Sequence, residues 1–207
     1  MLANAVVERA RVLDAGCGRT TRLASSKDRI SELVGVDLDA EAGEENDALD
    51  RFVAADLCSP LPFEDASFDV VYANFVVEHL ADPDAAFREW RRLLRPGGSL
   101  VLLTSNQANP LLAAARLLPW RARLLVKRSG AGVAERDVIP THYRANTPRA
   151  LAALAARTGF VAQEVAYVAG LHRYAARLRP LAVVLLGLER ILPSRLRATI
   201  VVHYRAS

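Results

Sequence analysis

Short apolar runs alternate with amphipathic stretches along this chain. The first clear run, Val12-Leu13, ends at Asp14 and is followed by the turn Gly16-Cys17-Gly18. Short apolar runs bounded by turn residues are typical of strands that are buried on both faces of a sheet. The pattern predicts seven strands, at residues 12–14, 33–37, 52–56, up to 74, 99–104, 160–168 and 199–204.

Helix signals lie between these runs. Asp82-Pro83 and Thr147-Pro148 each place a capping side chain before a proline, which the first turn of a helix tolerates well. Gly97 and Gly159 are positioned to end these two helices. Two further helices are expected at residues 19–26 and 40–49. Strands that alternate with helices of this length predict an α/β fold with a doubly wound, mainly parallel sheet and helices on both faces.

The composition fits one folded domain. With 207 residues, 52% of them hydrophobic, the chain is large enough to bury a core, and residues 1–207 are expected to form a single domain. No signal-peptide pattern and no stretch apolar enough to span a membrane is present. Cys17 and Cys58 lack metal-ligand spacing, which indicates a reducing compartment. We therefore expect a cytoplasmic protein.

The glycine turn and the next strand end predict a nucleoside site. Glycine lacks the Cβ that would block close approach, so backbone N–H groups between Gly16 and Gly18 stay open to a ligand. Asp37 closes the second strand and is placed to accept hydrogen bonds from both hydroxyls of a ribose.

Two nucleoside cofactors fit such a half-site. A dinucleotide such as NAD needs a third glycine three residues after Gly18, where this chain has Thr21. S-adenosylmethionine has no phosphate and needs only the Gly-x-Gly bend. Thr21 therefore favours S-adenosylmethionine.

Further motifs follow at compatible intervals. A third strand ends at Asp56-Leu57, a turn at 62–67 leads into the fourth strand, and Arg95-Pro96-Gly97-Gly98 leads into the fifth. With these motifs, residues 11–105 resemble the class I S-adenosylmethionine-dependent methyltransferases, most closely the small-molecule branch called type 11. The resemblance implies a seven-stranded Rossmann-like sheet whose last strand is antiparallel.

The resemblance also implies S-adenosylmethionine as the cofactor and the residues that bind it. In this family the glycine turn holds the methionine moiety, the acid after the second strand binds the ribose, and the acid after the third binds the adenine amino group. Leu38 and Leu57 would enclose the adenine, and Leu57 would also offer its backbone N–H. The cofactor-binding residues expected are Asp14, Gly16, Cys17, Gly18, Asp37, Leu38, Asp56, Leu57 and Asn74. Many members have a glycine where this chain has Thr20, and Thr20 or Thr21 is expected to cap the next helix.

Two long segments, 106–146 and 172–197, lie outside this plan. Loops of such length usually carry helices and often carry function. One interpretation packs them as amphipathic helices over the sheet edge. A second makes them the lid and wall of an acceptor pocket. A third is peripheral docking on an anionic membrane, against which Pro119 weighs because it would interrupt the basic amphipathic helix of the first segment.

The net charge of +4 raises the question of a nucleic-acid substrate. The arginines of the C-terminal half lack the interleaved aromatic residues and the recognised module that RNA binding normally shows. A nucleic-acid substrate is therefore not expected.

Three side chains are candidates for catalysis. A methyl group on a sulfonium is already electrophilic, so alignment with the acceptor is the main requirement. A general base helps only if the acceptor must lose a proton. His79, after the fourth strand, and His142 and Tyr143, after the first long segment, are the candidates, and each has a purely structural role as its alternative. Glu78 is expected to be a solvated or capping acid, and no metal site is expected.

Together these patterns predict a methyltransferase that uses S-adenosylmethionine and a small-molecule acceptor, for which an apolar compound is one option. The alternative is a non-catalytic relative that keeps the fold as a binding or scaffold module. Only about ten residues precede the first strand, whereas the family usually has N-terminal helices that cover the cofactor. The acceptor atom and the oligomeric state stay open.

Overall fold

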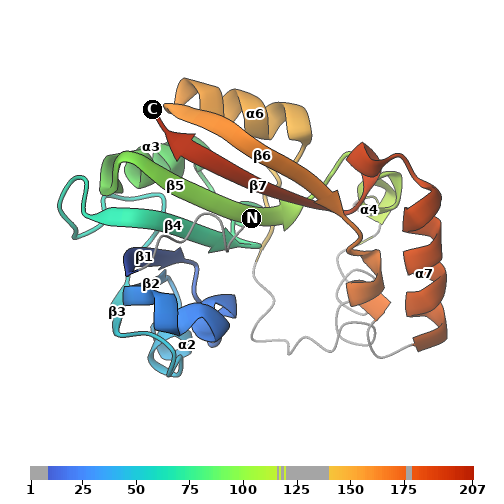
Figure 1. Cartoon of the computed structure of the whole chain (residues 1–207). Coiled ribbons are helices and arrows are strands. Elements are labelled where there is room, and N and C mark those ends of the chain that lie inside the picture. Colours follow the sequence, from blue (N-terminus) through green and yellow to red (C-terminus); the bar gives the residue numbers. More distant parts are fainter. Residues whose placement is uncertain (1–8, 116, 118, 120–139, 176–178) are drawn as a thin grey trace.

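The computed structural model describes residues 9–115, 117, 119, 140–175 and 179–207. Its centre is one seven-stranded sheet with the order β3-β2-β1-β4-β5-β7-β6 (Figure 1). The strands are β1 (Ala10–Ala15), β2 (Ile30–Asp37), β3 (Arg51–Ala54), β4 (Phe68–Asn74), β5 (Leu94–Ser105), β6 (Phe160–Val168) and β7 (Thr199–Ala206). The strands from β1 to β5 are parallel, and β7 is antiparallel to both β5 and β6. The expected seven-stranded α/β fold with an antiparallel last strand is confirmed.

Helices cover both faces of this sheet and also lie beyond the ends of β5 and β6 (Figure 1). They are η1 (Arg22–Arg29), α2 (Ala40–Glu44), α3 (Pro83–Leu93), α4 (Pro110–Ala115), α6 (Pro148–Arg157), η4 (Leu171–Ala175), α7 (Arg179–Ile191) and η5 (Ser194–Leu196). On one face, Phe87 and Trp90 of α3 and Leu151 of α6 join the larger buried cluster. On the other face, Leu23 of η1 packs against Val12 and other strand residues. Burial of these side chains provides the main driving force for the fold.

The first two helices differ from the prediction. A 3₁₀ segment at Arg22–Arg29 replaces the helix expected at 19–26, because Leu23 is its only buried side chain and little apolar surface holds a longer helix in place. Thr21 caps the segment by accepting a hydrogen bond from the Leu23 N–H, as expected. The helix expected at 40–49 ends at Glu44, since Asn46 turns back toward the glycine turn.

The helix that begins at Pro83 also ends earlier than expected. Leu94 already has extended backbone angles, so Gly97 lies in the strand segment rather than at the helix end. Pro96 disfavours helical geometry at Arg95, which explains the early exit. The extra residues form an irregularity where Phe68 pairs with Leu94 but Val70 pairs with Ser99.

The sheet brings the long connections to one edge. Because β6 runs parallel to β5, the segments after both strands leave from the carboxyl edge, where β1, β2 and β4 also end. Figure 1 shows α4 and α7 beyond the ends of β5 and β6, away from β3. The site residues predicted from the sequence therefore share an edge with both insertions.

Candidate cofactor site at the carboxyl edge

The turn after β1 depends on two glycines that differ in their surroundings. Both have positive φ, 74° at Gly16 and 51° at Gly18. A Cβ at Gly16 would lie 2.4 Å from Val76 Cγ2, whereas a Cβ at Gly18 would meet nothing within 4 Å. Packing against Val76 therefore excludes a side chain at Gly16, whereas the space next to Gly18 is open.

Asp37 lies directly against this turn. One of its carboxylate oxygens accepts the Gly18 N–H at 2.9 Å, and the other accepts the Asp39 N–H at 3.0 Å. A carboxylate oxygen can accept a second hydrogen bond, so Asp37 keeps capacity for ligand hydroxyls. The structure therefore brings the predicted ribose acid and the predicted glycine turn together.

Asp14 is a buried acid beneath the turn. It is 2% exposed, and its Oδ2 has no hydrogen-bond partner among the described residues. Burial raises the pKa of Asp14 from 3.8 to about 7, the Thr21 side chain lowers it through a hydrogen bond, and nearby Asp37 adds to the rise. An unpartnered buried carboxyl is costly, so it marks a place where a cationic ligand group would be stabilised.

The neighbouring strand continues this polar edge. Tyr72 pairs in register with Asp14, and Asn74 lies two residues further along β4, so all three side chains share one face. The Tyr72 hydroxyl and Asn74 Oδ1 are also buried without hydrogen-bond partners among the described residues. Burial raises the pKa of Tyr72 to about 12, which keeps its hydroxyl protonated at neutral pH.

The other residues predicted to contact the adenosine part of the cofactor differ in their exposure. Asp56 is exposed at the end of the β3 segment, and its carboxylate accepts the Cys58 N–H at 2.9 Å. Leu38 is 76% exposed and available to cover a ligand, whereas the Leu57 side chain is buried in the larger core cluster. Of the two leucines, only Leu38 presents its whole side chain at the surface.

The Cys17 side chain faces the interior. Its Sγ would lie 2.8 Å from a Cβ added at Gly35, and the residue is buried. Burial raises the pKa of Cys17 to about 12, with Asp14 and Asp37 adding to the rise. Such a thiol stays protonated and is a poor nucleophile.

Two supporting residues were missed by sequence reasoning. The buried Asn46 amide donates to the Gly18 carbonyl at 3.0 Å and the Cys17 carbonyl at 3.4 Å. Arg19 forms ion pairs with Glu41 and Glu45. Both contacts fix the glycine turn to the α2 region, and no local sequence pattern signals contacts between residues so far apart in the chain.

The expectation that Glu78 is a solvated or capping acid is wrong. The residue is buried rather than solvated, and its carboxylate accepts the Thr104 hydroxyl at 2.7 Å. The Asn146 amide donates to the same Thr104 hydroxyl oxygen, at 2.5 Å. Burial raises the pKa of Glu78, and the Thr104 hydrogen bond opposes that rise. The network joins the ends of β4 and β5 to the segment before α6.

The three catalytic candidates lie close together in this region. His79 Nδ1 is 2.6 Å from the Pro140 carbonyl oxygen, which makes Nδ1 the donor and leaves Nε2 as an acceptor in the neutral ring. The backbone N–H groups of His142 and Tyr143 donate to the Glu78 carbonyl at 2.7 and 3.2 Å. The structure therefore shows these residues tying the 140–143 segment to the β4–α3 connection.

Comparison with known proteins agrees with this geometry. Residues 13–102 match a family model described as a methyltransferase domain. The sterol 4-C-methyltransferase strm-1 of Caenorhabditis elegans is 36% identical over 111 residues, which are 49% of this chain and 33% of that protein. A malonyl-[acyl-carrier protein] O-methyltransferase of Enterobacter lignolyticus is 38% identical over 98 residues, 46% of this chain and 39% of that protein. Residues 13–102 of this chain are therefore similar to known methyltransferase domains.

The fold agrees over a larger span than the sequence does. The crystal structure of an S-adenosylmethionine-dependent methyltransferase from Mesorhizobium loti superposes with a TM-score of 0.67 at 23% identity, covering 97% of this chain and 92% of that one. The sequence matches to the two curated relatives span less than half of either relative. The methyltransferase resemblance expected from residues 11–105 is thus confirmed.

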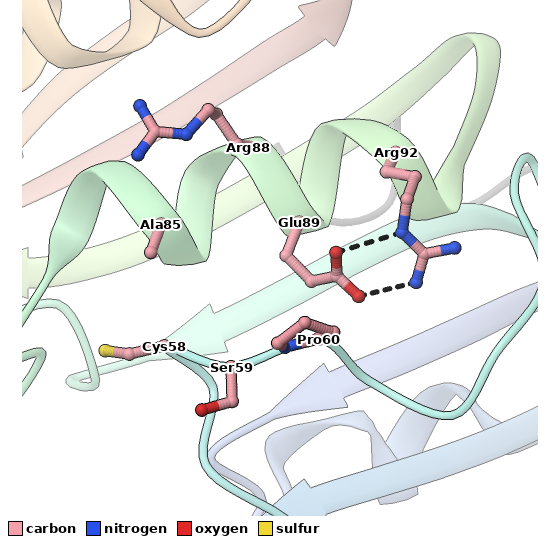
Figure 2. Close-up of a pocket in the computed structure, with 7 residues that line it drawn as sticks. All are labelled: Cys58, Ser59, Pro60, Ala85, Arg88, Glu89 and Arg92. Atoms are coloured by element: carbon pink, nitrogen blue, oxygen red, sulfur yellow. Dashed lines mark hydrogen bonds and ion pairs between the residues drawn. The ribbon is translucent and has the colours of Figure 1, made fainter.

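A surface pocket of about 300 Å³ lies next to the Asp56 end of this site. It lies between α3 and the loop after Asp56, and Figure 2 shows Glu89 and Arg92 facing each other along one wall. Arg92 also donates to the Phe63 and Leu61 carbonyls at 2.9 and 3.2 Å, and Glu89 accepts the Leu61 N–H at 2.7 Å. These charges hold the loop onto α3.

Neither a metal-binding cluster nor a membrane-spanning helix is present in the part of the chain that is described. Its His, Cys, Asp and Glu residues form no group of three or more that could hold a metal ion. None of its helices combines the length and apolar content needed to cross a bilayer.

Proposed function

We propose that this protein binds S-adenosylmethionine and transfers its methyl group to a small-molecule acceptor. The observation that carries the proposal is the buried Asp14 carboxyl, whose Oδ2 has no hydrogen-bond partner in the part of the chain that the structure describes, next to a glycine turn whose Gly18 leaves open space. A buried carboxyl next to a glycine turn suits a ligand that presents an ammonium group there, as the methionine part of this cofactor does.

The other cofactor contacts follow from the same edge. Asp37 would accept the ribose hydroxyls, Leu38 would cover the adenine, and Asp56 would accept its amino group. The backbone of Gly16 and Gly18 would contact the methionine moiety. Asn74 Oδ1 would be a further hydrogen-bond acceptor for the cofactor. Cys17 would contribute through its backbone, since its side chain faces the core, and Leu57 through its backbone N–H.

The chain's own residues mainly need to align the acceptor and exclude water. When bound, S-adenosylmethionine supplies an electrophilic methyl group on a sulfonium. Fixed alignment of two reactants is a large rate effect by itself. Where the acceptor must lose a proton, His79 is the best-placed base, because the Pro140 carbonyl fixes its Nδ1–H and leaves Nε2 free to accept a proton.

The insertions would form the acceptor side of the site. Arg173 of η4 lies over the Phe75 ring, 4.3 Å from its centroid, which brings the 172–197 insertion to the end of β4. His142 and Tyr143 would line the same side. The two relatives named above act, by their names, on a sterol and on a malonyl-acyl carrier protein. We propose an acceptor with an apolar body for this chain as well.

The cellular setting is part of the proposal. The two cysteines are free, and Cys17 is buried with a protonated thiol. This suits a reducing compartment, so we propose that the protein works in the cytoplasm.

Calorimetry tests the cofactor assignment. S-adenosylmethionine is expected to bind and NAD is not. Asp37→Ala is expected to weaken S-adenosylmethionine binding by about 1–3 kcal/mol, because hydrogen bonds to a charged acceptor are lost. Asp47→Ala, at an exposed acid, is the matched control. Binding of NAD alone, or equal affinity of the Asp37 variant, would contradict the assignment.

Methyl turnover tests the activity. Labelled S-adenosylmethionine and a metabolite extract are expected to yield a labelled small molecule. Tight cofactor binding without any incorporation would favour the non-catalytic alternative, in which the contacts of His79, His142 and Tyr143 serve only to hold the loop.

A further inference from the structure

Helix α7 places its polar and apolar residues the opposite way round from a surface helix in water. Glu189 is its only acid and is fully buried. Five large apolar residues of the same helix are exposed: Leu181, Val183, Val184, Leu188 and Ile191. A surface helix normally turns its apolar stripe inward and its charges outward.

The inward position of Glu189 has a clear structural cause. Its carboxylate accepts three backbone N–H groups, from Gly170, Leu171 and Ala198, each at 2.7 Å. These groups belong to the two ends of the insertion that joins β6 to β7. Leu185, on the same side of the helix, packs near Leu171 and Ala198. The acid therefore fixes the orientation of α7 and leaves the apolar residues outside.

The exposed side, called here the outer face of α7, combines apolar and basic residues. At helical spacing, Arg179 and Arg190 lie together along one margin of the five apolar residues, and both are exposed. Val183 is 70% exposed and Ile191 is 80% exposed. No acid lies on this face, since Glu189 points inward.

The distribution of charge along the chain indicates which kind of partner suits the outer face of α7. Residues 1–105 contain 11 Lys and Arg and 19 Asp and Glu, whereas residues 106–207 contain 16 Lys and Arg and only four acids. A second copy docked through the same face would bring Arg179 and Arg190 of one copy close to the same arginines of the other. Like charges would then repel each other. An anionic surface has complementary charge.

We propose that the outer face of α7 docks on the surface of an anionic lipid bilayer. The five apolar side chains would enter the boundary between headgroups and acyl chains, and Arg179 and Arg190 would meet lipid phosphates. Because the insertion leaves from the carboxyl edge of the sheet, this docking sets the acceptor side of the site near the membrane. The inference goes beyond the proposed function and does not depend on methyl transfer.

Vesicle sedimentation tests the proposal with the full chain. The protein is expected to sediment with phosphatidylcholine–phosphatidylglycerol vesicles at low salt, and much less with phosphatidylcholine alone. The double variant Val183→Glu and Ile191→Glu is expected to bind at least about tenfold more weakly, because charges would have to enter the bilayer boundary. Arg179→Gln and Arg190→Gln are expected to weaken binding to the anionic vesicles by about fivefold each.

A matched control separates docking from a general effect of charge. Val161→Glu with Val165→Glu adds the same charge at exposed valines of β6, and vesicle binding is expected to persist. Circular dichroism checks that each variant is folded. Absence of vesicle binding by the wild-type chain, or equal loss in both double variants, would overturn the proposal. So would light scattering that shows a dimer broken only by the α7 variant, because the face would then bind a second copy.

Discussion

The burial of the Asp14 carboxyl lowers the stability of the folded protein but suits the binding of a cationic ligand group. Its raised pKa means that the folded protein holds a proton that the unfolded chain releases at lower pH. Between pH 3.8 and about 7 the folded state therefore binds more protons, and stability falls as pH rises through this window. Above it, the full cost of an ionised buried carboxyl is present, about 4 kcal/mol at most.

The first prediction concerns Asp14→Asn. Above pH 7 this variant is expected to be more stable than wild type, and the difference should shrink as the pH approaches 4, because the wild-type carboxyl is then protonated. Its affinity for S-adenosylmethionine is expected to fall, since Asn cannot pair with an ammonium group as a carboxylate does. Urea unfolding across this pH range and calorimetry measure the two effects. A variant less stable at pH 8 would contradict the account.

The two glycines of the turn give a second prediction. Gly16→Ala is expected to destabilise the fold by about 2–4 kcal/mol, from a positive φ and a collision with Val76. Gly18→Ala should cost only about 1–2 kcal/mol, from φ alone, yet should strongly weaken cofactor binding because its Cβ enters the open space. Thermal unfolding and calorimetry separate the pair. Unchanged affinity in Gly18→Ala would show that the cofactor lies elsewhere.

At the scale of elements, α7 is held by the buried Glu189 carboxylate together with the apolar contact of Leu185. Glu189→Gln is expected to loosen η4 and α7, because the side-chain amide can no longer accept all three N–H groups. Hydrogen exchange at Gly170, Leu171 and Ala198 should accelerate about tenfold or more, while amides of β1 and β4 stay protected. Arg190→Gln, on the exposed side of the same helix, is the control. Equal acceleration in the control would refute this role of Glu189.

Strands were predictable from the sequence because their signal is local. The apolar runs at 33–37 and 160–168 correspond closely to β2 and β6, and the Asp82 and Thr147 caps are confirmed. The glycine turn and Asp37 also lie together as expected.

Features set by distant partners could not be predicted in this way. Asn46 acts on carbonyls nearly thirty residues away, and Glu78 is buried because Thr104 of another strand supplies a donor. Glu189 faces inward because backbone donors from both ends of its insertion meet there. In each case the deciding partner is brought close only by the finished sheet.

At the scale of the whole molecule, one end of the sheet is acidic and the other end is basic. Among the described residues, 9–105 contain 11 Lys and Arg and 18 Asp and Glu and form β1 to β5, whereas 140–175 and 179–207 contain nine Lys and Arg and two acids and form β6, β7 and their helices. The sheet places β3, β2 and β1 at one end and β7 and β6 at the other (Figure 1). Copies of the chain should therefore attract one another end to end when charges are poorly screened.

Static light scattering tests this attraction. The second virial coefficient is expected to be negative at low ionic strength and to rise as salt is added, because screening removes the attraction between unlike ends. A uniformly charged protein of the same net charge would show the opposite trend, so a coefficient that falls with salt would contradict the prediction.

The pairing of Val168 with Thr199 closes the insertion that carries α7 at its base. Residues 169–198 leave and re-enter the sheet at adjacent positions, so the sheet does not need them to keep its register. An insertion of another length could therefore replace residues 169–198 while β6 and β7 keep their register. If the two proposals on the acceptor side and on membrane docking hold, such an exchange would alter acceptor preference and membrane docking in one step.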